Sequence, residues 1–327
     1  NGVSKVQELQ MVTQKGSNVD VVAIHGNFDN AQSGVKAMFE NKELAEELAG
    51  KGYQFSSANS INIGRLVPQV VYYVYAYAKL LENEELANGE ELQVVVPTGN
   101  FGNILAAYYA KQMGVPIGKL ICASNENKVL FDFFQTGTYD KNREFVLTTS
   151  PSMDILISSN LESLIYVIAG EDSDKTKELM EALKKDGTYT VSEDMKAKLS
   201  DFAAGYATED ETAEQIHDVY DKTGYVMDTH TAVASYVCSR YEQSEKTGKK
   251  YLIASTASPY KFVKSVMTAI DAKYAEEDEF ALLPKLQELS QVGMPQAIKD
   301  ILDANVLHNI ECDVDQMEET VKQILNR

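Results

Sequence analysis

The sequence has little positive charge. Its 30 lysine and arginine residues are outnumbered by 49 aspartate and glutamate residues, which gives a net charge of −19 at neutral pH. Nucleic-acid binding is therefore not expected, because no positive field spreads over the surface. An anionic substrate must instead be bound by donors that gather in a local pocket.

Cysteines and histidines are too few and too scattered to indicate a metal centre. The three cysteines are odd in number and far apart: Cys122, Cys238 and Cys312. Their spacing predicts neither a disulfide framework nor a zinc site, and a reducing cytoplasm is the expected compartment. Three of the four histidines show no metal-ligand pattern: His25, His217 and His308.

Long hydrophobic runs are also missing. No apolar run is long enough to cross a bilayer, and the first residues have no signal-peptide character. The most apolar stretch, from Leu66 to Leu80, is rich in tyrosine and interrupted by Pro68 and Gln69. This composition is typical of a buried amphipathic helix, and we expect no membrane association.

Apolar runs alternate with helical patterns along much of the chain, as in a parallel α/β layer. Strands are expected at Val19–Ile24, Leu92–Val96, Leu120–Ala123 and Tyr251–Ala254, with a further candidate at Glu144–Leu147. Helices are expected at about Ile63–Leu80 and Ile104–Met113, and after Asn160. The sequence thus predicts an α/β protein with parallel sheets flanked by helices.

Changes in composition suggest how the domains are organised. Residues 1–58 are expected to belong to a smaller α/β domain, and residues 59–275 to a larger one. Residues 171–222 are polar, acidic and helical in pattern, which indicates a helical lobe inserted into the larger domain. Residues 276–327 are expected to form a helical C-terminal extension.

The strongest chemical signal is the turn Thr98-Gly99-Asn100-Phe101-Gly102-Asn103, which joins an apolar strand to a helix. The first turn of a helix has backbone N–H groups without intrahelical partners, and the helix dipole favours an anion there. Gly99 and Gly102 allow the main chain to approach a phosphate closely. The two asparagines can add amide donors or cap the helix.

Taken alone, this turn does not identify a ligand. It is not a P-loop, because no Gly-Lys-Ser/Thr follows, and its glycine spacing is not the dinucleotide fingerprint. An ordinary strand-to-helix turn rich in glycine and asparagine remains an alternative at this point.

Four segments in order resemble threonine synthases of the bacterial and fungal type. Val-Pro-Thr-Gly-Asn-Phe-Gly-Asn (Val96–Asn103) resembles the cofactor-phosphate loop of that family. The other matching segments are Ser57–Arg65 (SANSINIGR), Ser150–Ile155 (SPSMDI) and Ser255–Phe262 (STASPYKF), and the opening Gly2–Gln7 is similar too. The resemblance spans nearly the whole chain, and four ordered motifs are hard to obtain by accident.

The resemblance implies a fold-type II pyridoxal-phosphate enzyme, similar in fold to tryptophan synthase β. It implies the last step of threonine biosynthesis, in which O-phospho-L-homoserine and water give L-threonine and phosphate. It also implies a cradle for the phosphate of pyridoxal 5′-phosphate, formed by Gly99, Asn100, Phe101, Gly102 and Asn103. Thr256 is implied to lie beside the pyridine nitrogen, where a neutral hydroxyl leaves that nitrogen less firmly protonated than a carboxylate would.

Three further residues have two interpretations each. Asn62 could bind substrate or cap the long helix, and Arg65 could pair with the phosphate leaving group or form a structural ion pair. His230 could act as an acid or base near neutral pH. Alternatively, Asp228 or Thr229 caps a helix and His230 is structural.

The lysine that would hold the cofactor as a Schiff base is missing from the sequence. In the family it lies in a Thr-Gly-Lys-like motif, and no such motif occurs here. We therefore expect this lysine upstream of Asn1 and interpret the chain as a fragment, because it also lacks an initiator methionine. No catalytic residue is assigned within the chain, which is expected to be inactive alone.

Two other functions remain open. A serine or threonine dehydratase would share the cofactor, but it is expected to have a glycine-richer phosphate loop. A non-catalytic fragment could act only as a binding module. A dehydrogenase is disfavoured, because no acidic residue stands at the ribose position of a dinucleotide motif. The oligomeric state is not determined by the sequence.

Overall fold

The computed structural model describes residues 3–26, 28–60 and 62–326. The chain forms two compact units. The smaller unit contains residues 1–56, 224–226 and 258–327, and the larger one contains residues 57–223 and 227–257. This grouping differs from the expected division, because residues 258–275 and the helical extension after them join the N-terminal residues in the smaller unit.

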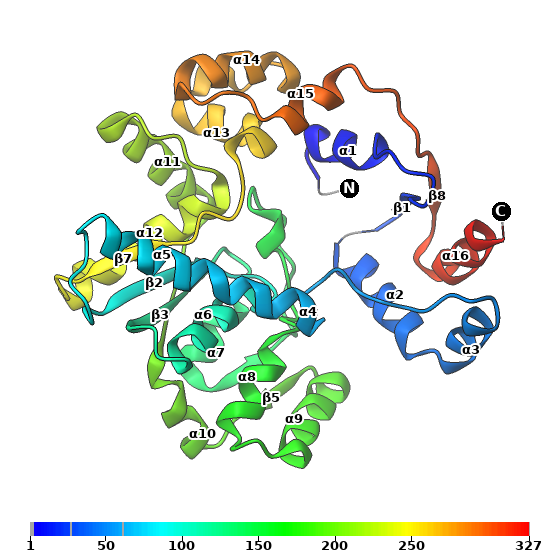
Figure 1. The fold of residues 1–327 in the computed structure, drawn as a ribbon, viewed down its shortest axis with the longest axis horizontal. Helices are drawn as coiled ribbons and strands as arrows, with labels where there is room; N and C mark the ends of the chain where they lie inside the picture. Colours follow the sequence, from blue (N-terminus) through cyan, green and yellow to red (C-terminus); the bar gives the residue numbers. More distant parts are fainter. Residues whose placement is uncertain (1–2, 27, 61, 327) are drawn as a thin grey trace. The chain divides into compact units, whose positions relative to one another are not determined.

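The larger unit is built on a four-stranded parallel sheet with the strand order β6-β3-β2-β7. Strands β3, β2 and β7 of this sheet are labelled in Figure 1. Its strands are β2 (Leu92–Pro97), β3 (Ile117–Ser124), β6 (Phe202–Tyr206) and β7 (Lys250–Ile253). Every residue of β2 is buried, which accounts for its almost continuous apolar sequence. The parallel α/β arrangement predicted from the sequence is confirmed.

Helices pack on both faces of this sheet, because side chains alternate along each strand. Val94 and Val96 point into a core shared with α5, α6 and α8, whereas Val95 packs against α12 on the opposite face. The helices of this unit are α4 (Ile63–Leu66), α5 (Val70–Glu82), α6 (Gly102–Gln112), α7 (Val129–Thr136), α8 (Leu161–Ile168), α9 (Ser173–Asp186), α10 (Glu193–Ala197), α11 (Glu209–Thr223) and α12 (Thr229–Glu245). A small antiparallel pair is formed by β4 (Thr138–Asp140) and β5 (Thr188–Thr190).

Two expectations about secondary structure were wrong. The acidic segment 171–222 is not a purely helical lobe, because β6 within it pairs with β3 at the edge of the main sheet. Residues 144–147 form no strand. The side chain of Asn127 takes the place of a neighbouring strand there, since its amide accepts from Val146 N at 2.9 Å and donates to Val146 O at 2.7 Å.

The smaller unit is mainly helical, with one two-stranded parallel sheet. Its strands are β1 (Val22–Ile24) and β8 (Ile310–Cys312), and its helices are α1 (Lys5–Val12), α2 (Phe28–Glu40), α3 (Lys42–Gly50), α13 (Val263–Ile270), α14 (Glu279–Ser290), α15 (Gln296–Leu302) and α16 (Met317–Leu325). Ser4 caps α1 in a capping box with Gln7. Among the described residues, no helix is long and apolar enough to span a membrane.

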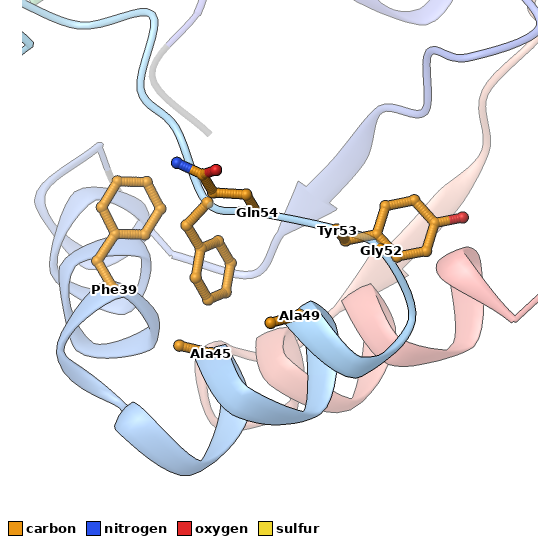
Figure 2. Close-up of a pocket in the computed structure, with 7 residues that line it drawn as sticks. Phe39, Ala45, Ala49, Gly52, Tyr53 and Gln54 are labelled. Atoms are coloured by element: carbon orange, nitrogen blue, oxygen red, sulfur yellow. The ribbon is translucent and has the colours of Figure 1, made fainter.

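An open hollow of about 580 Å³ lies between α2, α3 and the segment that follows α3 (Figure 2). The rings of Phe39 and Phe55 lie 5.1 Å apart. Ala45 and Ala49 face the hollow from α3 (Figure 2). Its lining is Phe39, Ala45, Ala49, Gly52, Tyr53, Gln54 and Phe55. None of these lining side chains carries a charge.

Candidate functional site

The loop Thr98–Asn103 leaves the C-terminal end of β2 and leads directly into α6. Ligands of open parallel α/β sheets bind at this edge, outside the carboxyl ends of the strands. The residue before α6, Phe101, has a left-handed backbone with φ of 67°, which is uncommon for a residue other than glycine. The loop is therefore a tightly folded connection at the edge where a ligand is expected.

Three backbone donors at the start of α6 are available for an anion. The first bond of the helix runs from Leu105 N to Phe101 O at 3.0 Å. Before it, the N–H groups of Gly102, Asn103 and Ile104 donate no hydrogen bond to any described residue. No carboxylate in the described part of the chain forms a hydrogen bond with this loop. Unpaired N–H groups at the positive end of a helix dipole suit a phosphate.

The segment at the start of α8 holds the middle of the loop. The carbonyl of Asn100 accepts from the backbone of Asn160 at 3.0 Å and from its side-chain amide at 2.7 Å. Ser158 Oγ donates to Gly99 O at 2.8 Å, and Ser159 Oγ donates to Asn100 Oδ1 at 3.1 Å. With its carbonyls bound on this side, the loop keeps its N–H groups free for a ligand.

Both glycines of the loop lie where no side chain fits. A Cβ at Gly99 would come within 2.4 Å of the carbonyl oxygen of Ser152, and a Cβ at Gly102 would come within 2.6 Å of Ser60 Cβ. Real Cβ atoms essentially never approach another heavy atom so closely. The loop therefore packs directly on two of the other motifs named above, Ser57–Arg65 and Ser150–Ile155.

Phe101 contributes to the site through its backbone alone. Its side chain is buried, with 1% of its surface exposed. The ring packs near Phe134 and Phe202, with centroids 6.1 and 5.9 Å away. The aromatic side chain thus anchors the loop in the core and is not available to contact a cofactor.

Asn103 is oriented by two side chains of the preceding helices. Its Oδ1 accepts a hydrogen bond from the hydroxyl of Tyr73, and its amide nitrogen donates to Gln69 Oε1 at 3.4 Å. The hydroxyl of Tyr73 is protonated at neutral pH and can donate, and burial raises its pKa further above the ordinary value. These contacts hold the Asn103 side chain in one orientation at the start of α6.

Asn62 and Arg65 both make local structural contacts. Asn62 caps α4, because its Oδ1 accepts from Gly64 N at 2.9 Å, and its amide donates to Ser57 O at 3.0 Å. Arg65 Nε donates to Ala58 O at 2.9 Å, and the residue is exposed. The capping interpretation of Asn62 is therefore confirmed, while a role of either residue toward substrate stays a prediction.

Thr256 leaves the sheet at the same edge as the loop. Val95 in β2 pairs with Ile253 in β7, and Ala254 N donates to Val95 O at 2.9 Å. Thr98 lies three residues after Val95, and Thr256 lies three residues after Ile253. Because β2 and β7 are adjacent and parallel, both threonines follow their strands at the same edge of the sheet. Thr256 is exposed, as a residue facing a ligand would be, but its contact with a pyridine nitrogen stays a prediction.

A buried polar cluster beside the loop was not anticipated. Asp154 is 2% exposed and accepts from Asn125 Nδ2 at 2.8 Å, Asn127 Nδ2 at 3.0 Å, Thr148 N at 3.0 Å and Thr148 Oγ1 at 2.7 Å. The cluster fixes the segment that carries Ser152, against which Gly99 packs. The signal was present in the sequence, because Asn125 and Asn127 directly follow a buried strand.

The start of α12 contains a second buried cluster. Asp228 caps this helix by accepting from the backbone of His230 at 2.9 Å and of Thr231 at 3.3 Å. Burial disfavours the charge of Asp228, but hydrogen bonds from His230 and Thr231 outweigh it and hold the pKa of the carboxyl below its ordinary value. The expected helix cap is therefore present, and His230 is bound within it.

The donor set of the loop fits the phosphate of pyridoxal 5′-phosphate. The loop offers backbone N–H groups and the oriented side chains of Asn100 and Asn103. Its two glycines have no side chain that would keep a ligand away from the main chain. Within the described ranges, no group of three histidine, cysteine, aspartate or glutamate side chains could bind a metal ion. Fold and site together define an α/β protein with a loop at the carboxyl edge of a parallel sheet, where unpaired backbone N–H groups begin a helix.

Comparison with known proteins identifies the family. Residues 231–321 match the family described as "Threonine synthase, C-terminal". The chain is 34% identical to the threonine synthase of Saccharomyces cerevisiae over 325 residues, which cover 94% of this chain and 61% of that protein. It is 42% identical to human "Threonine synthase-like 1" over 280 residues, which cover 85% of this chain and 37% of that protein. The chain belongs to the threonine synthase family.

A solved structure supports the same assignment. The crystal structure of threonine synthase from Brucella melitensis with bound pyridoxal phosphate matches with a TM-score of 0.79 and 35% sequence identity. The match covers 98% of this chain and 62% of that one. The fold is that of fold-type II pyridoxal-phosphate enzymes, as the sequence resemblance implied. The chain thus spans between about a third and two thirds of the length of the relatives it matches.

Proposed function

We propose that this chain carries the cofactor-phosphate part of a threonine synthase, a carbon–oxygen lyase that converts O-phospho-L-homoserine and water to L-threonine and phosphate. The observation that carries the proposal is the loop Thr98–Asn103, with three unpaired N–H groups at the start of α6. Membership of the threonine synthase family supports the choice of reaction.

Pyridoxal 5′-phosphate, when bound, supplies the electron withdrawal that the reaction needs at the α and β carbons. The role proposed for this chain is to bind and orient that group. The backbone of Gly99 to Asn103 would hold its phosphate, and the hydroxyl of Thr256 would face the pyridine nitrogen. Asn62 and Arg65 are proposed on the substrate side, with the exposed guanidinium of Arg65 able to pair with a phosphate.

No residue of this chain is proposed to transfer a proton. The resemblance to the family places the lysine that binds the cofactor in a Thr-Gly-Lys-like motif, and our proposal locates that motif before Asn1. We also propose a cytoplasmic location. The three cysteines are all free thiols in the structure, and free thiols are typical of a reducing compartment.

The test is an assay of the full-length protein that the gene encodes, with pyridoxal phosphate present. We expect release of phosphate from O-phosphohomoserine and formation of threonine in equal amounts. Arg65→Ala should raise KM for O-phosphohomoserine more than it lowers kcat. Lys51→Ala serves as a control, because Lys51 is an exposed cation at the C-cap of α3 in the smaller unit and forms an ion pair with Glu47.

The same assay separates the alternatives left open by the sequence. Conversion of serine or threonine to a keto acid and ammonia, without phosphate release, would identify a dehydratase. Binding of pyridoxal phosphate without turnover of either substrate would indicate a binding module. A full-length protein that does not bind pyridoxal phosphate at all would refute the proposal.

A further inference from the structure

Asp228, His230 and Thr231 lie at the start of α12 and are almost completely buried, at 1%, 3% and 5% exposure. The reaction proposed above assigns them no role. A helix cap alone needs only the carboxylate of Asp228, yet each of the three side chains also makes a contact beyond the cap. Two of these contacts lead from α12 to segments proposed to bind the cofactor.

The first contact joins His230 to the segment behind the phosphate loop. Ser152 N donates to His230 Nε2 at 3.2 Å, across 78 residues of sequence. Because Nε2 accepts this bond, the proton of the neutral ring must be on Nδ1, which lies 3.2 Å from Asp228 Oδ1. The carboxylate of Asp228 therefore selects the tautomer that can hold Ser152.

Ser152 is in turn the residue against which Gly99 packs. The carbonyl oxygen of Ser152 lies 2.4 Å from the position that a Cβ of Gly99 would take. Thr229 Oγ1 ties the same segment to α12 by donating to Thr149 O at 2.7 Å. A displacement of Ser152 would thus shift Gly99 and the N–H groups that follow it.

The second contact leads to the other side of the site. Thr231 Oγ1 is within hydrogen-bond distance of Asp228 Oδ2 and lies 3.2 Å from Ser255 Oγ. Ser255 immediately precedes Thr256, the residue proposed to face the pyridine nitrogen. One carboxylate is therefore linked to the phosphate loop through His230 and to the segment of Thr256 through Thr231.

We propose that Asp228, His230 and Thr231 form one positioning unit, which sets the phosphate loop and the segment of Thr256 in register for a single bound cofactor. His230 acts on the phosphate end through Ser152 and Gly99, and Thr231 acts on the ring end through Ser255. The inference rests on the proposed function, because it assumes that pyridoxal phosphate binds at this loop.

The first test compares two replacements of His230 in the full-length protein. In His230→Asn the side-chain amide can still donate to Asp228, but no atom reaches Ser152 N. In His230→Gln the amide oxygen can reach the position of Nε2 and accept from Ser152 N. We expect the dissociation constant of pyridoxal phosphate, measured by fluorescence titration, to rise about tenfold in His230→Asn, because Ser152 N loses the acceptor that holds its segment against Gly99. His230→Gln should restore most of the affinity.

Inorganic phosphate, used as a competitor of pyridoxal phosphate, locates the effect. His230→Asn should weaken competition by phosphate to a similar extent, because phosphate probes the loop alone. Thr231→Val should leave competition by phosphate unchanged and should instead shift the absorption spectrum of bound pyridoxal phosphate, since it alters the ring end. Thr231→Ser keeps the hydroxyl and should keep the wild-type spectrum.

The outcomes separate the inference from the proposed function. If both His230 variants bind pyridoxal phosphate like the wild type, or if both lose affinity equally as their thermal midpoints fall, the positioning unit is refuted. If Thr231→Val weakens phosphate competition as His230→Asn does, the division into two ends is wrong.

A wild-type protein that binds pyridoxal phosphate but does not convert O-phosphohomoserine refutes only the proposed function. A wild-type protein that does not bind pyridoxal phosphate refutes both.

Discussion

Replacement of Gly99 by alanine is the sharpest test of the phosphate loop. The added Cβ would lie 2.4 Å from the carbonyl oxygen of Ser152 and 3.3 Å from Met153 Cα, whereas ordinary van der Waals contact begins at 3.4 Å. Both atoms belong to the backbone, so no flexible side chain can move aside. Ser152 is itself held by His230 at 3.2 Å, and the loop is therefore the part that must move.

The size of the effect follows from the overlap. An overlap of about 1 Å with backbone atoms is comparable to overpacking of a core, which costs about 1–3 kcal/mol. If the loop relieves it by moving away from Ser152, its N–H groups leave the positions that suit a phosphate. A loss of about 2 kcal/mol in binding would weaken the affinity for pyridoxal phosphate by a factor of about 30.

The assay is a titration of pyridoxal phosphate followed by fluorescence, together with urea unfolding of each variant. Gly50→Ala is the matched control, because a Cβ at Gly50 at the end of α3 would have no neighbour within 4 Å. The control should keep its affinity and gain slightly in stability. Gly99→Ala with wild-type affinity would show that the loop at Gly99 does not bind the cofactor phosphate.

Three further predictions concern single side chains around the site. Tyr73→Phe removes the hydroxyl that donates to Asn103 Oδ1, and it should lower the free energy of unfolding by about 1 kcal/mol in urea titrations, with weaker binding of pyridoxal phosphate. Leu105→Ala removes a fully buried side chain in the first turn of α6 and should cost about 3 kcal/mol in the same titrations. A change below about 1 kcal/mol would contradict this packing. Burial raises the pKa of the half-buried Glu209 despite the hydrogen bond from Thr149 N, so wild-type stability should fall as pH rises through the pKa of the folded state. Glu209→Gln removes this titration. The free energy of unfolding of the variant minus that of the wild type should therefore increase as the pH rises from about 4 to about 7. A difference that stays constant over this range would refute the raised pKa of Glu209.

Some features of the site could be predicted because their causes are local. The strand β2 is an almost unbroken apolar run, and the glycines and asparagines after it mark the turn into α6. The caps at Ser4, Asn62 and Asp228 depend on side chains that reach backbone groups two or three residues away. Such contacts leave a short and recognisable pattern in the sequence.

Other elements were misjudged because their causes are distant in the sequence. The strand β6 lies in an acidic, helix-rich segment and is extended because it pairs with β3, about 80 residues earlier. The expected strand at 144–147 is absent because the side chain of Asn127 satisfies the backbone of Val146.

The sequence by itself determined that Thr98–Asn103 is a turn from a buried strand into a helix, because an apolar run, two glycines and two asparagines are a local pattern. Only the tertiary structure decided how that loop is held. The carbonyl of Asn100 is bound by Asn160, 60 residues further on, and Gly99 rests on Ser152, which His230 fixes from 78 residues away. Contacts over such distances depend on how strands and helices pack, and no local pattern of residues records them.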